Sequence, residues 1–276
     1  MIFSSHFKRM SIYEKEKSSE ESVVICVVGN FGYLRKHLNK FIENLREKGK
    51  YSGEVLVLTS YFTPLFLLNI KNKQSLNFKK FRKIKFDSET DNILKKLNSK
   101  GQPNRHIHKN FQWHKLHLFD KELKNWNYVF YMDINLIIHD DVNQIIELKE
   151  IGTLLAREDG YPNFDWLLSE QFDITNFRFR ELSKKYDLEI KNYFQTGLMF
   201  FDTKIITNST KSEILELIKK FPITLTNEQA IFNLYFIYHR NVYKPLPAHV
   251  GGKTTYYYWK ENDNTIITKQ IVPKYK

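Results

Sequence analysis

Apolar runs alternate with amphipathic helical patterns along this chain, and that alternation restricts its fold more than any other feature. Residues 23–28 form an apolar run that ends at Gly29. Over residues 33–48, apolar side chains then recur at spacings of three and four, as on one face of a helix. A strand, a turn and a helix in this order are the repeating unit of α/β folds.

The same order of elements continues to the end of the chain. We predict further strands at residues 54–60, 81–86, 128–132, 151–157 and 197–202. Helices are expected from residue 88, between residues 105 and 123, and at residues 212–220 and 227–238, with a helical insert at 166–187. A closing loop with Pro245, Pro247 and two glycines precedes an aromatic tail at 256–259. The pattern predicts an α/β fold with a Rossmann-like, mostly parallel central sheet and helices on both faces.

The domain prediction is one large domain over residues 22–276. Residues 1–21 are polar and charged, and we expect a loosely ordered N-terminal arm there. No repeat and no linker rich in Gly, Ser or Pro interrupts the remainder. The single cysteine, Cys26, lies inside the first apolar run, so we expect it to fill the core in a reducing compartment.

Charge and hydropathy narrow the classes of partner. The chain carries 43 Lys and Arg against 31 Asp and Glu, a net charge of +12, which favours anionic partners such as nucleotides, polynucleotides or anionic membrane surfaces. No nucleic-acid-binding module is recognisable, so a nucleic-acid partner is not predicted. No stretch resembles a signal sequence or approaches the roughly 20 apolar residues of a membrane span. We therefore expect a soluble, intracellular protein without a membrane span.

Two polar residues follow the most apolar strand. Asp133 and Asn135 come directly after the run 128–132, and ligands of open α/β sheets bind at the carboxyl ends of the strands. Oxygen ligands two residues apart in extended chain point to the same side and suit Mg²⁺ or Mn²⁺. A metal there could stabilise a diphosphate leaving group. A plain strand end followed by an ordinary turn explains the same residues.

Four motifs in one order give this chain a wider resemblance. The stretch Lys115-Leu116-His117 precedes the strand that ends in Asp133-Ile134-Asn135; Gln195-Thr196-Gly197, Glu228-Gln229 with Asn233, and His249 with Lys253 follow in that order. This series resembles the glycogenin-like branch of glycosyltransferase family 8. The resemblance covers most of residues 23–259 and implies a GT-A fold. The chain departs from the family pattern in Asn135, where a second carboxylate is usual, and in Glu228, where aspartate is usual.

The resemblance also implies a role for each matched residue. Asp133, Asn135 and His249 would be the metal ligands, and Lys115, Glu228 and Gln229 would act at the reacting centre. The nucleotide-sugar would be held by a larger set: Val28, Asn30, Tyr33, Asp133, Gln195, Gly252 and Lys253.

The implied activity is a metal-dependent, retaining transfer of a hexose from a UDP-sugar to a protein or glycan acceptor. The donor expected first is UDP-glucose and then UDP-galactose, with Mn²⁺ or Mg²⁺ as cofactor. Abundant tyrosines make self-glucosylation a hypothesis, and a homodimer stays open. The alternative is a non-catalytic nucleotide-sugar-binding protein, which the departures at Asn135 and Glu228 favour.

Overall fold

A computed structural model provides the structure of the chain and describes residues 21–71, 76–99, 105–160, 164–258 and 264–269. Apart from Glu21, the predicted N-terminal arm lies outside the described residues. The proposed domain limits therefore stay a prediction.

The described residues form a large sheet of seven strands in the order β3-β2-β1-β4-β7-β6-β8. All strands of this sheet except β7 run in one direction, and β7 is antiparallel to both of its neighbours. The prediction of an α/β fold with a mostly parallel central sheet is thus confirmed. The strands are β1 (Val23–Val28), β2 (Val55–Ser60), β3 (Leu76–Phe81), β4 (Tyr128–Met132), β6 (Leu154–Glu158), β7 (Phe194–Asp202) and β8 (Tyr243–Pro245).

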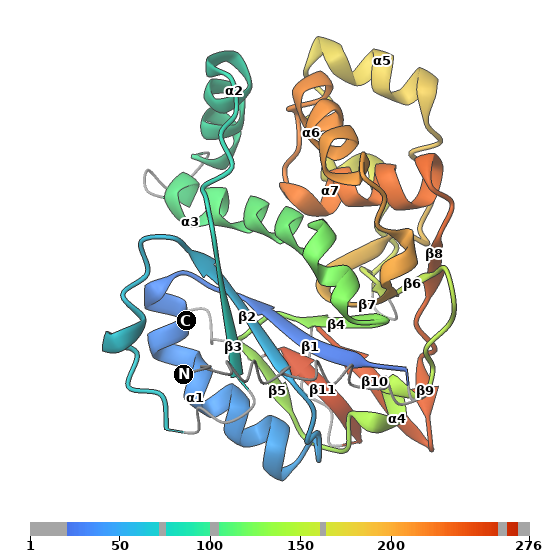
Figure 1. Ribbon diagram of the computed structural model, residues 1–276. Coiled ribbons are helices and arrows are strands. Elements are labelled where there is room, and N and C mark those ends of the chain that lie inside the picture. Colours follow the sequence, from blue (N-terminus) through green and yellow to red (C-terminus); the bar gives the residue numbers. More distant parts are fainter. Residues whose placement is uncertain (1–20, 72–75, 100–104, 161–163, 259–263, 270–276) are drawn as a thin grey trace, which may run out of the picture.

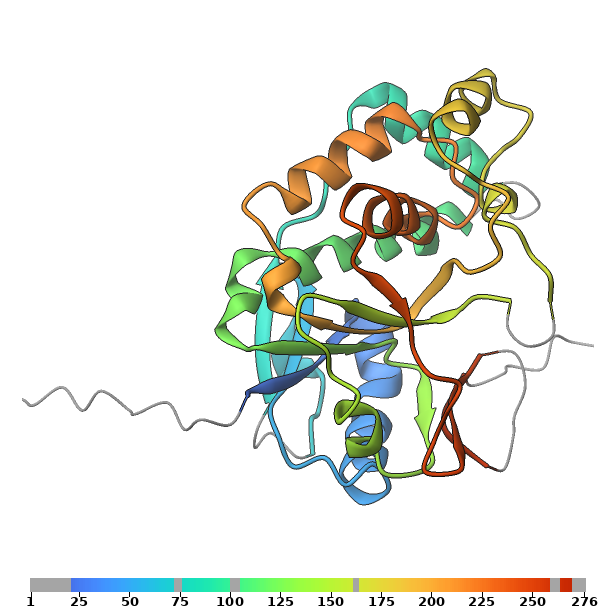
Figure 2. The same ribbon diagram turned by 90° about the vertical axis from the view of Figure 1, so that its right-hand side faces the viewer.

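Helices cover both faces of this sheet, as Figures 1 and 2 show. One face carries the long helix α1 (Phe31–Glu47) and the short α4 (Asn143–Ile146). The opposite face carries α2 (Ser88–Asn98), α3 (Arg105–Gln112), α5 (Phe177–Lys185), α6 (Thr210–Lys220) and α7 (Glu228–Asn233). The remaining helical parts of the described residues are five 3-10 segments and one π-helix. They are η1 (Leu65–Leu67), η2 (Trp113–Phe119), η3 (Lys121–Asn125), η4 (Leu168–Gln171), η5 (Thr203–Ile205) and the π-helical η6 (Leu234–His239).

The hydrophobic core has two parts, one on each face of the large sheet. Successive side chains of a strand point to opposite faces, so Val24 and Cys26 of β1 join one part while Ile25 and Val27 join the other. Cys26 is fully buried, as expected for a residue that fills the core.

A second, four-stranded sheet is the main feature that the sequence prediction missed. It has the order β5-β11-β10-β9 and consists of β5 (Leu136–Ile138), β9 (His249–Val250), β10 (Lys253–Tyr257) and β11 (Thr265–Lys269). Part of the predicted closing loop and two residues of the predicted aromatic tail, Tyr256 and Tyr257, are therefore in strands, and Trp259 lies outside the described residues. Gly251 and Gly252, both with positive φ, make the two-residue turn between β9 and β10, a turn type that favours glycine.

The predicted strand at residues 81–86 was also wrong. The strand in this part of the chain is β3, which pairs with β2 in parallel from Leu76 to Phe81, and residues 82–87 are irregular. Both stretches alternate apolar and basic residues, so the pattern alone did not separate them. β3 is an edge strand, where lysines such as Lys79 and Lys80 are well tolerated.

None of the described helices combines the length and the apolar composition that crossing a membrane would require.

Candidate active site

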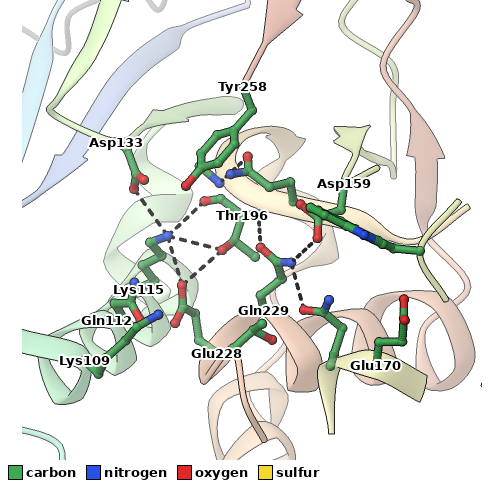
Figure 3. Close-up of a pocket in the computed structure, with 15 residues that line it drawn as sticks. Lys109, Gln112, Lys115, Asp133, Asp159, Glu170, Thr196, Glu228, Gln229 and Tyr258 are labelled. Atoms are coloured by element: carbon green, nitrogen blue, oxygen red, sulfur yellow. Dashed lines mark hydrogen bonds and ion pairs between the residues drawn. The ribbon is translucent and has the colours of Figure 1, made fainter. Parts of the chain in front are cut away.

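A cavity of about 430 Å³ opens where the carboxyl ends of β4 and β6 meet the amino end of β7. The antiparallel direction of β7 brings its first residues, rather than its last, to this edge. Figure 3 shows the polar side chains that converge on the cavity. Its lining consists of Lys109, Gln112, Lys115, Asp133, Asp159, Trp166, Glu170, Gln171, Gln195, Thr196, Gly197, Thr226, Glu228, Gln229 and Tyr258.

Lys115, in η2, links two of the carboxylates that line this cavity. Its Nζ lies 2.9 Å from Glu228 Oε1 and 3.3 Å from Asp133 Oδ1, and it donates to the Thr196 carbonyl oxygen at 3.1 Å (Figure 3). Burial alone would lower the pKa of Lys115, but the two carboxylates outweigh it and raise that pKa above its usual value. Lys115 is therefore a fixed positive charge at neutral pH.

Asp133 ends β4, and its carboxylate is held by three neighbours. The Tyr131 hydroxyl donates to Oδ1 at 2.6 Å, and the ammonium groups of Lys115 and Lys269 lie 3.3 Å from Oδ1 and Oδ2 respectively. Burial would raise the pKa of Asp133, but Lys115, Lys269 and the tyrosine bond together lower it to about 2. Asp133 is consequently ionised at any physiological pH.

Glu228 begins α7 and is almost fully buried. Its Oε1 accepts from Lys115 and from the Thr196 hydroxyl at 3.0 Å, whereas Oε2 has no hydrogen-bond partner among the described residues. The preceding Asn227 adopts φ 54° and ψ −121°, a conformation that costs a non-glycine residue energy. Asn98 and Gln112 each hydrogen-bond the Asn227 side chain at 2.9 Å and so hold it in place. Strained backbone and an unpartnered buried oxygen are features of sites prepared for a ligand.

Gln229 connects α7 to Asp159, the residue that follows β6. Its amide nitrogen donates to Asp159 Oδ2 at 2.9 Å and to Gln171 Oε1 at 3.1 Å. Tyr193 also donates to Asp159 Oδ2, at 3.2 Å. Burial raises the pKa of Asp159 to about 6, although these two hydrogen bonds act in the opposite direction. Asp159 therefore titrates closer to neutrality than an ordinary aspartate does.

Five residues of the predicted site line this one cavity: Lys115, Asp133, Gln195, Glu228 and Gln229. Gln195 is anchored because its Oε1 accepts from the Gly197 amide and from the Tyr256 hydroxyl, both at 3.1 Å. The motif residues of η2, β4, β7 and α7 thus come together in space.

The predicted nucleotide-binding turn lies next to this cavity along the sheet edge. β1 pairs with β4 in parallel, with Cys26 opposite Tyr131, so Val28 at the end of β1 lies beside the end of β4. Asn30 caps α1 by accepting from the Tyr33 amide at 2.9 Å, and the Tyr33 side chain is exposed. This turn borders the end of β4 on the side away from β7.

The three residues of the closing motif are not brought to the cavity. His249 is exposed in β9, three strands from β5, which corresponds to about 14 Å across the sheet. Gly252 follows it in the turn. Lys253 forms an ion pair with Asp140, at the end of β10 opposite to Tyr258, about 16 Å along the strand from the cavity.

The predicted metal ligands do not fit a divalent cation in this arrangement. Asp133 and Asn135 do lie together, but the oxygens that would bind a metal both face the Lys269 ammonium, 3.3 Å and 2.8 Å away. His249 is distant, and the part of the chain that the structure describes contains no cluster of three or more His, Cys, Asp or Glu residues able to hold a metal.

Comparison with known proteins finds similarity in sequence and in fold. No protein-family model matches the chain. Over 163 residues the chain is 25% identical to galactinol synthase 2 of Arabidopsis thaliana, a match that covers 56% of this chain but only 45% of the plant protein. The structure resembles the galactosyltransferase LgtC in complex with donor and acceptor sugar analogs, with a TM-score of 0.54 and 11% identity over 91% of this chain and 87% of that one. It also resembles the bifunctional glycosyltransferase WbbM, with a TM-score of 0.55 and 13% identity over 92% of this chain and 46% of that one.

The chain has the GT-A glycosyltransferase fold. The resemblance to the glycogenin-like proteins of glycosyltransferase family 8, first seen in the order of the motifs, is confirmed by the relative and by the structural neighbours together. The chain spans less than half the length of galactinol synthase 2.

Three residues of this candidate site were not singled out in the sequence. Asp159 closely follows the strand predicted at 151–157, so the rule that drew attention to Asp133 would also have found it. Lys269 carried no such signal, because β11 was not recognised as a strand. Tyr258, next to the end of β10, was assigned to an aromatic tail and instead lines the cavity.

Proposed function

We propose that this GT-A protein transfers a hexose from a UDP-sugar, with UDP-glucose the first candidate, to a protein or glycan acceptor. The observation that carries the proposal is the bridge that Lys115 forms between Asp133 and Glu228 at the edge of the sheet where nucleotide ligands bind. The names of the relatives support a sugar-transferring activity. Retention of the anomeric configuration is proposed from the family resemblance.

The reaction breaks the bond between the anomeric carbon and the diphosphate oxygen, and the acceptor oxygen bonds to the same carbon. The acceptor proton passes to the departing diphosphate. Positive charge develops on the sugar ring, and negative charge on the leaving group. Lys115 supplies a permanent positive charge for the leaving group, while the buried Glu228 carboxylate faces the cavity that would hold the sugar.

Gln229, Gln195 and Asp159 offer polar atoms for the sugar hydroxyl groups. Gln229 donates to Asp159 and accepts from the Thr196 amide, and Gln195 accepts from the adjacent Gly197 amide. Their positions are therefore set before a donor arrives. Preorganised polar groups lose little entropy on binding and raise specificity.

The test is a screen of UDP-sugars for UDP release, with and without added Mn²⁺, on the wild type, Asp133→Ala and Glu228→Gln. We expect turnover of UDP-glucose, and a loss of at least about a hundredfold in both variants, as for removal of a charge-stabilising group. Glu43→Gln on the exposed face of α1 is the matched control and should keep full activity. Full activity of Asp133→Ala would show that the site is elsewhere.

The same experiment addresses the alternative of a non-catalytic nucleotide-sugar-binding protein, which the neutral Asn135 favours. Binding of UDP-glucose without release of UDP, for every acceptor offered, would support that alternative. Intact-mass measurement after incubation with UDP-glucose tests self-glycosylation, because each transfer to the protein adds the mass of one hexose. An unchanged mass during active turnover would exclude it.

A further inference from the structure

Lys269 occupies the space between Asp133 and Asn135. Its Nζ lies 3.3 Å from Asp133 Oδ2 and 2.8 Å from Asn135 Oδ1. The residue reaches this place because β11 pairs antiparallel with β5 and sets Lys269 opposite Leu136, the first residue after Asn135. The side chain is only 17% exposed, so its position is defined by the fold.

The surroundings of Lys269 suit a resident ammonium group. Its Nζ lies 5.3 Å from the centre of the Tyr258 ring, a contact in which the ring face attracts a cation. The other oxygen of Asp133 is engaged by Lys115 and by the Tyr131 hydroxyl. Both carboxylate oxygens of Asp133 are therefore already paired with positive charge or a hydrogen-bond donor.

Charge balance explains why an amide stands at position 135. A divalent cation held by two carboxylates is locally neutral, and so is one ammonium group held by one carboxylate and one amide. An amide at position 135 in place of a carboxylate removes one negative charge. A single lysine in place of a divalent cation removes one positive charge, so the two changes balance. A metal ion at the same oxygens would lie within a few ångströms of Lys269 and be repelled by it.

We propose that Lys269 takes the place of a divalent cation, so that this protein binds the diphosphate of its nucleotide-sugar without a metal. The inference rests on the proposed function, since it concerns the donor of that reaction. Lys269 and Lys115, on opposite oxygens of Asp133, are the two ammonium groups that would face the sugar diphosphate.

The test is calorimetric titration of the full chain with UDP in EDTA and in Mn²⁺. Wild-type protein is expected to bind UDP in EDTA, with a Kd that Mn²⁺ changes by less than about twofold. Lys269→Met keeps the length of the side chain without its charge and should weaken UDP binding in EDTA at least tenfold. Lys269→Arg keeps the charge and should retain most of the wild-type affinity for UDP in EDTA. Lys40→Met, which removes an exposed lysine paired with Glu43, is the control and should bind as the wild type does.

A rebuilt metal site provides the complementary measurement. The double variant Lys269→Ala/Asn135→Asp presents two carboxylates without the ammonium group, and its UDP binding should depend on Mn²⁺. Circular dichroism and thermal unfolding verify that each variant is folded.

Three results would overturn the proposal. These are wild-type binding that requires Mn²⁺, unchanged binding by Lys269→Met in EDTA, and a double variant that does not respond to Mn²⁺. Failure of the wild type to bind UDP or UDP-glucose under either condition would instead refute the proposed function itself.

Discussion

Asn233 of α7 binds both polar backbone groups of Phe194 in β7. Its Oδ1 accepts from the Phe194 amide and its Nδ2 donates to the Phe194 carbonyl oxygen, both at 2.7 Å, while Nδ2 also donates to the Gln229 carbonyl oxygen at 2.9 Å. One buried side chain therefore fixes the helix that carries Glu228 and Gln229 against the strand that carries Gln195 and Thr196.

Replacing Asn233 with leucine tests how much these hydrogen bonds contribute to the free energy of unfolding. The Phe194 amide and carbonyl would lose these partners in a buried place, and each unsatisfied group costs about 1–3 kcal/mol. We expect the free energy of unfolding in urea to fall by about 2–5 kcal/mol. As a control, Asn143→Leu removes a more exposed amide from α4 and should cost much less; similar losses for the two would argue against a special role for Asn233.

The pairing of Lys115 with Glu228 gives a second prediction. Lys115→Met leaves a buried carboxylate without its positive partner, which typically costs about 3–5 kcal/mol. The double variant Lys115→Met/Glu228→Gln removes both charges and should recover more than half of that loss without recovering transfer activity. Urea unfolding of the two single variants and the double variant measures the coupling, and simple additivity of the two losses would contradict it.

Asp159 predicts a pH dependence of stability. Burial raises its pKa from 3.8 to about 6, so between these values the folded protein binds more protons than the unfolded chain. The contribution of Asp159 to the free energy of unfolding therefore falls as the pH rises through this window and is constant above it.

Asp159→Asn removes the buried charge and keeps an oxygen that can accept from Gln229 and Tyr193. We expect this variant to match the wild type below about pH 4 and to exceed it by up to about 2–3 kcal/mol at neutral pH. Thermal or urea unfolding across the pH range provides the measurement. A difference that does not grow with pH would mean that Asp159 does not titrate in this window.

Gly197 leaves little room for a side chain beside the cavity. An added Cβ would lie 2.8 Å from Gln195 Oε1 and 2.9 Å from the Tyr256 hydroxyl, closer than real contacts allow. Gly197→Ala should force both groups to move, cost about 1–3 kcal/mol and raise the KM for UDP-glucose. Gly32→Ala, whose Cβ would lie at an ordinary 3.6 Å from Asn30, is the stability control, and equal stability of both variants would contradict the prediction.

Much of the large sheet could be predicted from the sequence because its strands are long apolar runs between recognisable helices. β1, β2 and β4 were found almost to the residue. The second sheet was missed for a physical reason. β9 has two residues, β10 contains threonine and tyrosine but no aliphatic residue, and β11 has only two aliphatic residues, flanked by threonines. The pair Gly251-Gly252 was the available signal, since adjacent glycines between two short strands favour a tight hairpin turn.

The site residues that could be predicted are likewise those of the large sheet, and those that were missed or misplaced belong mainly to the second sheet. Asp133, Lys115 and Glu228 lie on or beside elements of the large sheet, and the structure brings them together. Matching the closing motif directed attention to His249 and Lys253, although the lysine of the second sheet that lies beside Asp133 is Lys269. Which lysine of the second sheet reaches Asp133 depends on how the strands of that sheet pair, and local sequence patterns do not contain that information.

The second sheet also determines when the candidate site can form during synthesis of the chain. His139, next to β5, hydrogen-bonds Thr268 of β11 across a separation of 129 residues, so β5 leaves the ribosome long before the strand that pairs with it. Until β11 emerges, Asp133 and Asn135 lack the ammonium group between them. A ribosome-bound chain that stops before β11 should therefore hold a nearly complete large sheet and an unfinished donor site.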